Sequence, residues 1–267
     1  MQQVCGHECE ESGYGEAVLL IHGAILSDTF APLMHEKALA GFRCIRYRRR
    51  GYGSSVRLSN EPTIEESVRD AFELLEHLGE PHAHVVAHSG GGPIAVQMAI
   101  SEPDVVRSLV LLEPALQNAV MAAAFDELLA PLVEMYDAGE RAKAVHLFMR
   151  TATNPDWRAE TEERLPGAAD RAEYDAAATF HGDLPALRRW DFETVVGRIN
   201  QPSLLMVGSV SAPRVRQVTT MFREAVPASE FAVIEGADHS LPMTKPATVA
   251  MVIAEFLHRH PIALAST

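Results

Sequence analysis

A buried strand that runs into a serine turn and then directly into a helix is the sequence feature that most constrains the fold. This segment spans residues 84–95 and bends at Ser89. A nucleophile on such a turn has a strained backbone, so the side chains two positions away on either side must be small, as Ala87 and Gly91 are. The turn raises the serine hydroxyl above the sheet, and the free amide groups of the helix N-terminus face its target. The segment therefore predicts a nucleophilic serine.

A glycine-rich turn with an incidental serine and a phosphate-binding loop are the alternatives for this segment. A phosphate-binding loop needs a lysine after its glycines, whereas Gly91 and Gly92 are followed by Pro93. Short motifs of this kind also occur by chance. The prediction of a catalytic serine therefore depends on the rest of the chain.

Short apolar runs that alternate with longer helical patterns predict a parallel sheet covered on both faces. We predict strands at 18–21, 44–47, 84–87, 109–112, 204–207 and 231–234. Thr63 and Glu66 form a capping-box pattern before a helix that extends to Leu78, and Pro246 opens a last helix to about His258. In a chain of 267 residues this alternation indicates one doubly wound α/β domain.

The alternation stops between Ala115 and about Gly197, where the pattern is helical throughout. This stretch contains both tryptophans, Trp157 and Trp190. We interpret residues 115–197 as a helical cap inserted into the sheet domain, and residues 1–114 and 198–267 as that domain.

Three further motifs follow the order and the spacing of a known superfamily. An apolar run at 18–21 leads into His22 and Gly23, residues 49–55 contain a Gly-x-Gly-x-Ser turn, and residues 238–240 read Asp-His-Ser. With the Ser89 turn they resemble the α/β-hydrolase fold superfamily over nearly the whole chain. The resemblance implies a mostly parallel twisted sheet, covered by helices on both faces and carrying an inserted helical cap, and it implies a serine-based mechanism.

The resemblance also implies the groups that would act with Ser89. The backbone amides of Ala24 and Gly90 would form the oxyanion hole, where loss of one donor typically costs about 100- to 1,000-fold in rate. His239 would take the serine proton and return it to the leaving group. His88 is the rival base, but neighbours on such a turn point in different directions, so we expect it to pack beside the sheet or to line the pocket.

The acid of the predicted triad is missing from the position that is usual in the superfamily. The loop after the next-to-last strand has no carboxylate, and Ser211 occupies about the place of the expected aspartate. Glu113 ends the strand that follows the serine helix, and some lactone hydrolases and haloalkane dehalogenases supply the acid from that strand end. We therefore assign Glu113 as the acid. A backbone-capping role for Glu113, and Asp238 as the acid, are the alternatives.

Two further sets of residues bear on the site. We expect the substrate pocket to include His88, Ile25, Trp157 and Leu241. Arg48, Arg49 and Arg50 follow the second predicted strand. They fit either an anion-binding loop or a solvated basic turn, and we favour the basic turn because runs of charge are usually surface features.

Composition and charge exclude several classes of partner. A formal net charge of −13 disfavours nucleic acid and anionic membranes, and no apolar segment approaches the roughly 20 residues that cross a bilayer. The N-terminus lacks a signal-peptide pattern, and three cysteines indicate a cytoplasmic protein with reduced thiols. We interpret Cys5, His7 and Cys9 as alternating residues of a strand, because a structural zinc site needs four ligands.

The function that we predict is hydrolysis of a carboxylic ester or lactone through an acyl-serine intermediate, with no metal and no organic cofactor. The expected partner is a small to medium, mainly apolar substrate, and the sequence leaves a homodimer open. The same fold also hosts lyases, cofactor-free oxygenases and ligand receptors with little turnover. These remain the alternative functions.

Overall fold

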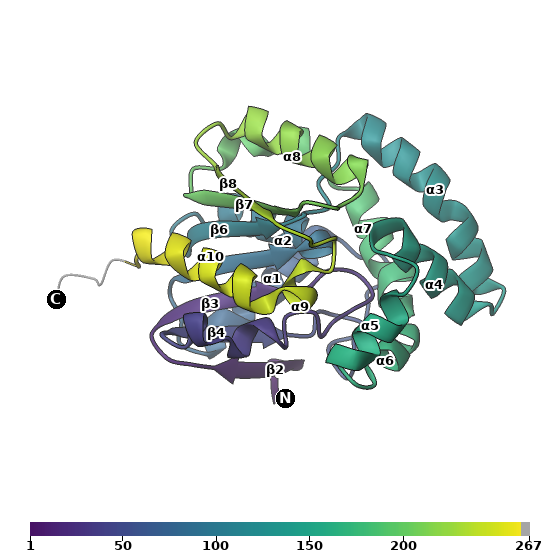
Figure 1. Cartoon of the computed structure of the whole chain (residues 1–267), viewed down its shortest axis with the longest axis horizontal. Helices are drawn as coiled ribbons and strands as arrows, with labels where there is room; N and C mark the ends of the chain where they lie inside the picture. Colours follow the sequence, from purple (N-terminus) through teal and green to yellow (C-terminus); the bar gives the residue numbers. More distant parts are fainter. Residues whose placement is uncertain (263–267) are drawn as a thin grey trace.

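The computed structural model describes residues 1–262 and contains one eight-stranded sheet in the order β1-β2-β4-β3-β5-β6-β7-β8 (Figure 1). The hairpin of β1 and β2 is antiparallel and joins β4 in antiparallel fashion, whereas all other neighbours are parallel. The strands are β1 (Gln2–Val4), β2 (His7–Ser12), β3 (Glu16–Ile21), β4 (Phe42–Tyr47), β5 (Ala83–His88), β6 (Val106–Leu112), β7 (Ser203–Gly208) and β8 (Glu230–Ile234). The predicted α/β-hydrolase fold class is confirmed.

All six predicted strands lie within β3 to β8. Four strands of the sheet centre, β3, β5, β6 and β7, are almost wholly buried, which explains their unbroken apolar runs. The expectation of cover on both faces is wrong for β8, because β8 is the edge strand and leaves Phe231 and Val233 exposed. Cys5 also departs from its predicted strand: it lies in the turn between β1 and β2 with a positive φ of 48°.

Successive residues of the strands face two different cores. Leu19 and Ile21 pack with helices α1 (Ile64–His77), α2 (Gly92–Ser101) and α8 (Pro213–Ala225) on one face of the sheet. Val18 and Leu20 pack with α10 (Pro246–Arg259) on the other face, and Figure 1 shows α10 crossing in front of the strands. This period of two is what a sheet covered on both faces requires. Helices α1, α2, α8 and α10 thus cover the two faces and leave the carboxyl edge of the sheet for other segments.

The predicted limits of two helices agree with the structure. Helix α1 begins after Thr63, whose side chain accepts a hydrogen bond from the Glu66 amide while the Glu66 side chain accepts one from the Thr63 amide. Helix α10 begins at Pro246 as predicted and extends to Arg259. The remaining short helices of the sheet domain are η1 (Leu33–His35), η2 (Lys37–Leu39), η3 (Ser89–Gly91) and α9 (Leu241–Thr244).

The chain between β6 and β7 is helical wherever it is regular, and Figure 1 shows these helices gathered at one end of the sheet. They have a core of their own that includes Phe148, Trp157 and Phe180. From Ala186 onward the chain instead packs on the core of the sheet. The helices are α3 (Ala119–Asp137), α4 (Arg141–Ala152), α5 (Trp157–Arg164), α6 (Ala168–Tyr174), the π-helix η4 (Ala178–Asp183), α7 (Leu184–Arg188), η5 (Phe192–Thr194) and η6 (Val196–Arg198).

The division of the chain at 115 and 197 stays a prediction. Residues 263–267 of the predicted segment 198–267 lie outside the described residues. Between residues 1 and 262, no helix is both long and apolar enough to cross a membrane.

The basic segment after β4 is not the solvated turn that we favoured. The side chains of Arg48, Arg49 and Arg50 are only 13%, 2% and 12% exposed. Arg49 pairs with Asp183, and Arg50 pairs with Asp70. Such burial is tolerated because each guanidinium has a carboxylate partner.

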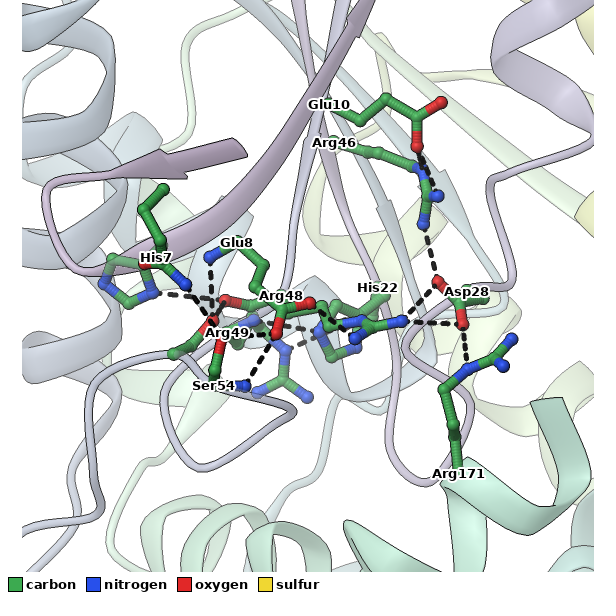
Figure 2. Close-up of polar contacts among 12 residues, drawn as sticks. His7, Glu8, Glu10, His22, Asp28, Arg46, Arg48, Arg49, Ser54 and Arg171 are labelled. Atoms are coloured by element: carbon green, nitrogen blue, oxygen red, sulfur yellow. Dashed lines mark hydrogen bonds and ion pairs between the residues drawn. The ribbon is translucent and has the colours of Figure 1, made fainter. Parts of the chain in front are cut away.

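Asp28 is the centre of the largest charge cluster of this region. Arg46, Arg48 and Arg171 approach it from three sides, as Figure 2 shows, at N–O distances of 2.8, 3.1 and 2.9 Å. Burial raises the pKa of Asp28, but the hydrogen bond from Arg46 and the positive charges of the three arginines outweigh it and lower the pKa to about 2. Arg171 belongs to α6, so the cluster ties that helix to β4.

We expect Asp28→Asn to lower the free energy of unfolding at pH 7 by about 2–4 kcal/mol, because it leaves buried guanidinium groups without their carboxylate. A lowered pKa stabilises the fold above the unfolded value near 4, and that contribution disappears as the pH falls through about 2. Urea unfolding at pH 7, 4 and 2.5 checks this: the pH dependence between 4 and 2.5 should be weaker in the variant. An equally steep dependence in both proteins would contradict it.

Candidate active site

The Ser89 turn has the strained backbone that its small neighbours predict. Ser89 has a φ of 49° between β5 and η3. A Cβ on Gly91 would lie 2.4 Å from the carbonyl oxygen of Ile21, so no larger residue fits there. A Cβ on Gly23 would lie 2.8 Å from Cβ of Ser89, so the chain after β3 passes directly beside the serine. The turn is therefore fixed by close contact with β3 and the chain that follows it.

Strained residues gather around this turn. Ile25, Ser89 and Glu113 are three of the four residues other than glycine with positive φ among residues 1–262, at 64°, 49° and 44°. Each directly follows or closely follows a central strand of the sheet. A left-handed conformation costs roughly 1–3 kcal/mol in such residues, and strain of this kind clusters at functional sites. Three of these four strained residues thus lie at or just after the carboxyl ends of β3, β5 and β6.

Glu113 and His239 are brought together across 126 positions of sequence. Nδ1 of His239 lies 2.7 Å from Oε2 of Glu113. The other carboxylate oxygen accepts hydrogen bonds from the Gly208 amide at 2.7 Å and from the Ser211 hydroxyl. A carboxylate can only accept hydrogen bonds, so Nδ1 of His239 carries the proton and donates a hydrogen bond to Glu113. Nε2 of the neutral imidazole is then free to accept a proton.

The Glu113 side chain is fully buried, with 0% of its surface exposed. Burial raises its pKa, but the hydrogen bonds from His239, Gly208 and Ser211 outweigh burial, so the pKa lies below its usual value. The carboxylate is therefore ionised at neutral pH and places a negative charge beside the imidazole.

The two alternative acid positions have other contacts. Asp238 accepts hydrogen bonds from the Asn154 side chain at 3.1 Å and from the Ser240 amide at 2.8 Å. Ser211, at the place of the missing aspartate, donates to Glu113. Ser211 thus acts on the histidine through Glu113, a link that the sequence did not indicate.

Ser89 and His239 line one cavity of about 380 Å³ together with Glu113. Within residues 1–262 no hydrogen bond joins the Ser89 hydroxyl to the imidazole. Catalytic hydrogen bonds are often long without substrate and shorten in the complex. Ser89 and the Glu113–His239 pair therefore line the same cavity.

Ala24 and Gly90 lie together beside Ser89. A Cβ on Gly90 would lie 3.4 Å from the Ala24 nitrogen, and both residues line a small cavity of about 50 Å³ next to Ser89. Gly90 is in the first turn of the helical segment that begins at Ser89, where amides have no acceptor within the helix. Two neighbouring backbone amides are thus available at the serine.

Arg49, which we expected in a solvated basic turn, instead supports the backbone beside Ser89. Its guanidinium donates to the carbonyl oxygens of His22 and Gly23 at 3.0 and 2.9 Å. His22 completes the arrangement, because Nδ1 contacts the Gly23 oxygen at 2.7 Å and Nε2 accepts from the Arg49 amide at 3.0 Å. The peptide bond is planar and trans, so fixing the Gly23 oxygen also fixes the opposite direction of the Ala24 N–H.

Asp183 of η4 holds Arg49 in place. It accepts from the Arg49 guanidinium at 2.6 and 2.9 Å and from the Tyr52 hydroxyl at 2.6 Å. The Tyr52 hydroxyl also lies 2.9 Å from Oγ1 of Thr179, which accepts from the Ile25 amide. Residues 22–25 are therefore fixed from both sides by a buried network that reaches into η4. The local signal was the position of Arg49 just after β4, at the edge where the strand ends meet.

We expect Arg49→Lys to lower kcat by about 10- to 100-fold with little change in KM, because lysine cannot bond two carbonyls and Asp183 in one plane, and the Ala24 amide then loses its fixed direction. Steady-state kinetics with an ester substrate checks this. Arg43→Lys is the matched control, since Arg43 pairs with Glu11 and Glu80 away from the site. Equal losses in both variants, or a loss confined to KM, would contradict this role for Arg49.

His88 lies behind the catalytic histidine. Its Nε2 donates to the carbonyl oxygen of His239 at 2.8 Å, and the two rings lie 4.6 Å apart. Burial, and then the charge of His239, lower the pKa of His88 to about 3. His88 is therefore neutral at working pH and supports the backbone of His239, and it also lines the larger cavity.

The other three predicted pocket residues lie elsewhere. Neither cavity beside Ser89 in the described chain is lined by Ile25, Trp157 or Leu241. Ile25 and Trp157 pack in the core of the helical segment, where the Trp157 indole donates to His146, and Leu241 packs beneath the sheet with α10. The prediction was wrong for these three because their apolar side chains face the protein interior. The larger cavity is instead lined by Met121, Phe125, Leu128, Phe148, Met149, Val215 and Val218, among others.

A metal centre finds no support in the described chain. Residues 1–262 contain no group of three or more His, Cys, Asp or Glu side chains arranged to hold a metal ion. His7, from the sequence pattern that suggested one, instead contacts the Arg48 carbonyl oxygen and Asp70.

Comparison with known proteins agrees with this architecture. The sequence matches the alpha/beta hydrolase family over residues 18–252. The chain belongs to this family. One curated relative of this chain is a Variovorax paradoxus protein named "Putative carbamate hydrolase RutD". It is 35% identical over 199 residues, which make up 72% of this chain and 72% of that protein.

Solved structures share the fold of this alpha/beta hydrolase. The enol-lactonase from Burkholderia xenovorans LB400 has a TM-score of 0.82 at 18% identity, and the alignment covers 96% of this chain and 98% of that one. A thermophilic esterase from Thermogutta terrifontis has a TM-score of 0.80 at 24% identity, with 96% and 94% covered. These likenesses show the fold, and the family match together with the Variovorax paradoxus relative supports a hydrolase.

Proposed function

We propose that this alpha/beta hydrolase cleaves a carboxylic ester or lactone through an acyl-serine intermediate. The observation that carries the proposal is the buried Glu113–His239 pair, which shares a cavity with a strained serine. Two neighbouring backbone amides lie at the same serine. This is the arrangement that acyl transfer requires: nucleophile, base, orienting acid and oxyanion donors.

In the proposed mechanism Oγ of Ser89 attacks the carbonyl carbon, and Nε2 of His239 takes the hydroxyl proton. The amides of Ala24 and Gly90 hold the negative oxygen of the tetrahedral intermediate, while Glu113 stabilises the imidazolium. When the carbon–oxygen bond of the ester breaks, His239 gives its proton to the leaving alkoxide. A water molecule, deprotonated by His239, then attacks the acyl-serine, which releases the carboxylic acid and restores Ser89.

The helices between β6 and β7 provide much of the cavity wall. Phe125 and Leu128 of α3 and Phe148 and Met149 of α4 line it. We propose that residues 115–197 act as a cap that gives the site its apolar character, and that the partner is a small to medium substrate. A volume of about 380 Å³ is in the range of small-molecule sites.

Two further proposals concern the cellular compartment and the oligomeric state of the protein. The three cysteines, Cys5, Cys9 and Cys44, are free, which favours the cytoplasm. A homodimer also remains a proposal.

Carbamate hydrolysis is the second candidate, favoured by the name of the Variovorax paradoxus relative. The same serine chemistry would then form a carbamoyl-serine. The Ser89 site supports both reactions, because both begin with attack on a carbonyl carbon.

The test is pre-steady-state kinetics with 4-nitrophenyl esters, an aliphatic lactone and a 4-nitrophenyl carbamate. We expect a burst of nitrophenolate equal to the enzyme concentration, followed by faster steady turnover of esters than of carbamates. Faster turnover of the carbamate would favour the second candidate. A protein that shows no burst and no turnover, and that fails to react with a fluorophosphonate at Ser89, would contradict both and favour a receptor or a non-hydrolytic enzyme.

A further inference from the structure

Arg214 is a charged residue of the cavity wall that the proposed mechanism does not use. It is the second residue of α8 and lines the larger cavity with Ser89, Glu113 and His239. Much of the remaining wall is apolar, and its other polar side chains near α8 and α4, such as Gln217 and Thr151, are uncharged. A guanidinium in such surroundings calls for an explanation.

Arg214 has no carboxylate partner within the described residues. Between residues 1 and 262 no carboxylate oxygen comes within 4.0 Å of its guanidinium, and its side chain makes no hydrogen bond. Burial lowers the pKa of Arg214, and only the charge of Glu113 opposes that effect. Arg214 differs in this respect from the arginines in and just after β4, because Arg46, Arg48 and Arg49 each pair with a carboxylate.

Glu113 does not serve as the carboxylate partner of Arg214, because both Glu113 oxygens already make hydrogen bonds. Oε2 contacts His239, and Oε1 accepts from Gly208 and Ser211. Turning Glu113 toward Arg214 would break the contact that orients the imidazole. Among the described residues, the positive charge of Arg214 in the cavity wall is therefore not balanced by a carboxylate contact.

We propose that Arg214 binds a carboxylate of the substrate, so that the natural substrate is a half ester, or a lactone, with a carboxylate away from the bond that is cleaved. This deepens the proposed function and rests on it. A planar guanidinium matches a carboxylate with two parallel hydrogen bonds. One arginine, in a site that already holds the negative charge of Glu113, suits a single negative charge better than a phosphate dianion.

The experiment compares two substrates that differ in that charge. Mono-4-nitrophenyl glutarate carries the carboxylate, and 4-nitrophenyl hexanoate is a neutral chain of similar length. We expect the wild-type protein to have the higher kcat/KM for the glutarate. Arg214→Met should lower kcat/KM for the glutarate by about 10- to 100-fold, mainly through KM, and lower it for the hexanoate by no more than a few-fold. Arg214→Lys should recover part of the loss in kcat/KM for the glutarate, because lysine keeps the positive charge but cannot make the two parallel hydrogen bonds of a guanidinium.

Arg223→Met is the matched control on the same helix. Arg223 is exposed and lies over the ring of Phe231 at 5.0 Å, away from both cavities. The ratio of the two kcat/KM values should be the same in Arg223→Met as in the wild type. Equal losses for both substrates in Arg214→Met would show a structural role and overturn the proposal. A wild-type preference for the neutral ester that Arg214→Met leaves unchanged would overturn it as well.

Binding without turnover separates this inference from the proposed function. Glutarate is titrated by calorimetry into the Ser89→Ala protein and into the Ser89→Ala/Arg214→Met protein. We expect Kd to be at least about tenfold weaker in the second, which supports the anion site even if the esters are not hydrolysed. Equal Kd values in two folded proteins would overturn the anion site while leaving ester hydrolysis intact.

Discussion

Replacement of Ser89 by alanine is expected to lower kcat for an ester by roughly 10⁴- to 10⁶-fold, because the nucleophile and the remaining triad members act as a unit. Binding should change little, since the apolar wall and Arg214 are untouched. Nitrophenyl ester kinetics, corrected for the uncatalysed reaction, measure the loss. Retention of more than a few per cent of the activity would contradict the role of Ser89.

Ser89 also allows strain to be separated from chemistry. Its φ of 49° is unfavourable for alanine as much as for serine, whereas glycine adopts it freely. We expect Ser89→Gly to be more stable than Ser89→Ala by about 1 kcal/mol, although both are inactive. Urea unfolding of the two variants gives this difference. Equal stabilities would show that the turn relaxes in the variants.

The second large effect is expected for Glu113→Gln, with kcat lowered at least about 100-fold and up to roughly 10⁴-fold. The glutamine oxygen can still accept from Gly208 and Ser211, so its NH₂ group faces Nδ1 of His239 and donates to it. The imidazole must then carry its proton on Nε2, the nitrogen that has to accept the serine proton. Loss of the carboxylate charge adds to this effect. Steady-state kinetics between pH 6 and 9 measure it.

Ser211→Ala is the matched control for the acid. It removes one of three hydrogen bonds to Glu113 and leaves those from Gly208 and His239 in place. We expect kcat to fall by less than about tenfold, since one hydrogen bond to a charged group contributes roughly 1.5–3 kcal/mol and only part of that acts on the histidine. A large loss in Ser211→Ala with a small loss in Glu113→Gln would contradict the assignment of Glu113.

The fold could be predicted because its signals are local and periodic. Apolar runs such as residues 109–112 mark strands buried on both faces, and the Ser89 turn marks the crossover into α2. Glu113 was open to reasoning from sequence for the same reason: it directly follows such a run, and the carboxyl ends of parallel strands meet at one edge. His239 meets Glu113 at this edge because the loop after β8 also lies there.

The rest depended on contacts that no local pattern encodes. Arg49 reads as part of a basic run, but its partner Asp183 lies 134 residues further along the chain. The direction that a side chain takes on a helix of the 115–197 segment depends on how that helix packs, so Trp157 was placed in the pocket although its ring points into the core. Arg214 carried no signal, because its lack of a partner is visible only in three dimensions.

The acyl-serine itself is the most direct test of the account. A quenched reaction of the Glu113→Gln protein with a 4-nitrophenyl ester, in which the weakened histidine slows deacylation, should gain the mass of one acyl group on the peptide that contains Ser89. The Ser89→Ala protein should gain none. An acyl group on another residue, or ester turnover by the wild type without any covalent adduct under fast quenching, would contradict the account.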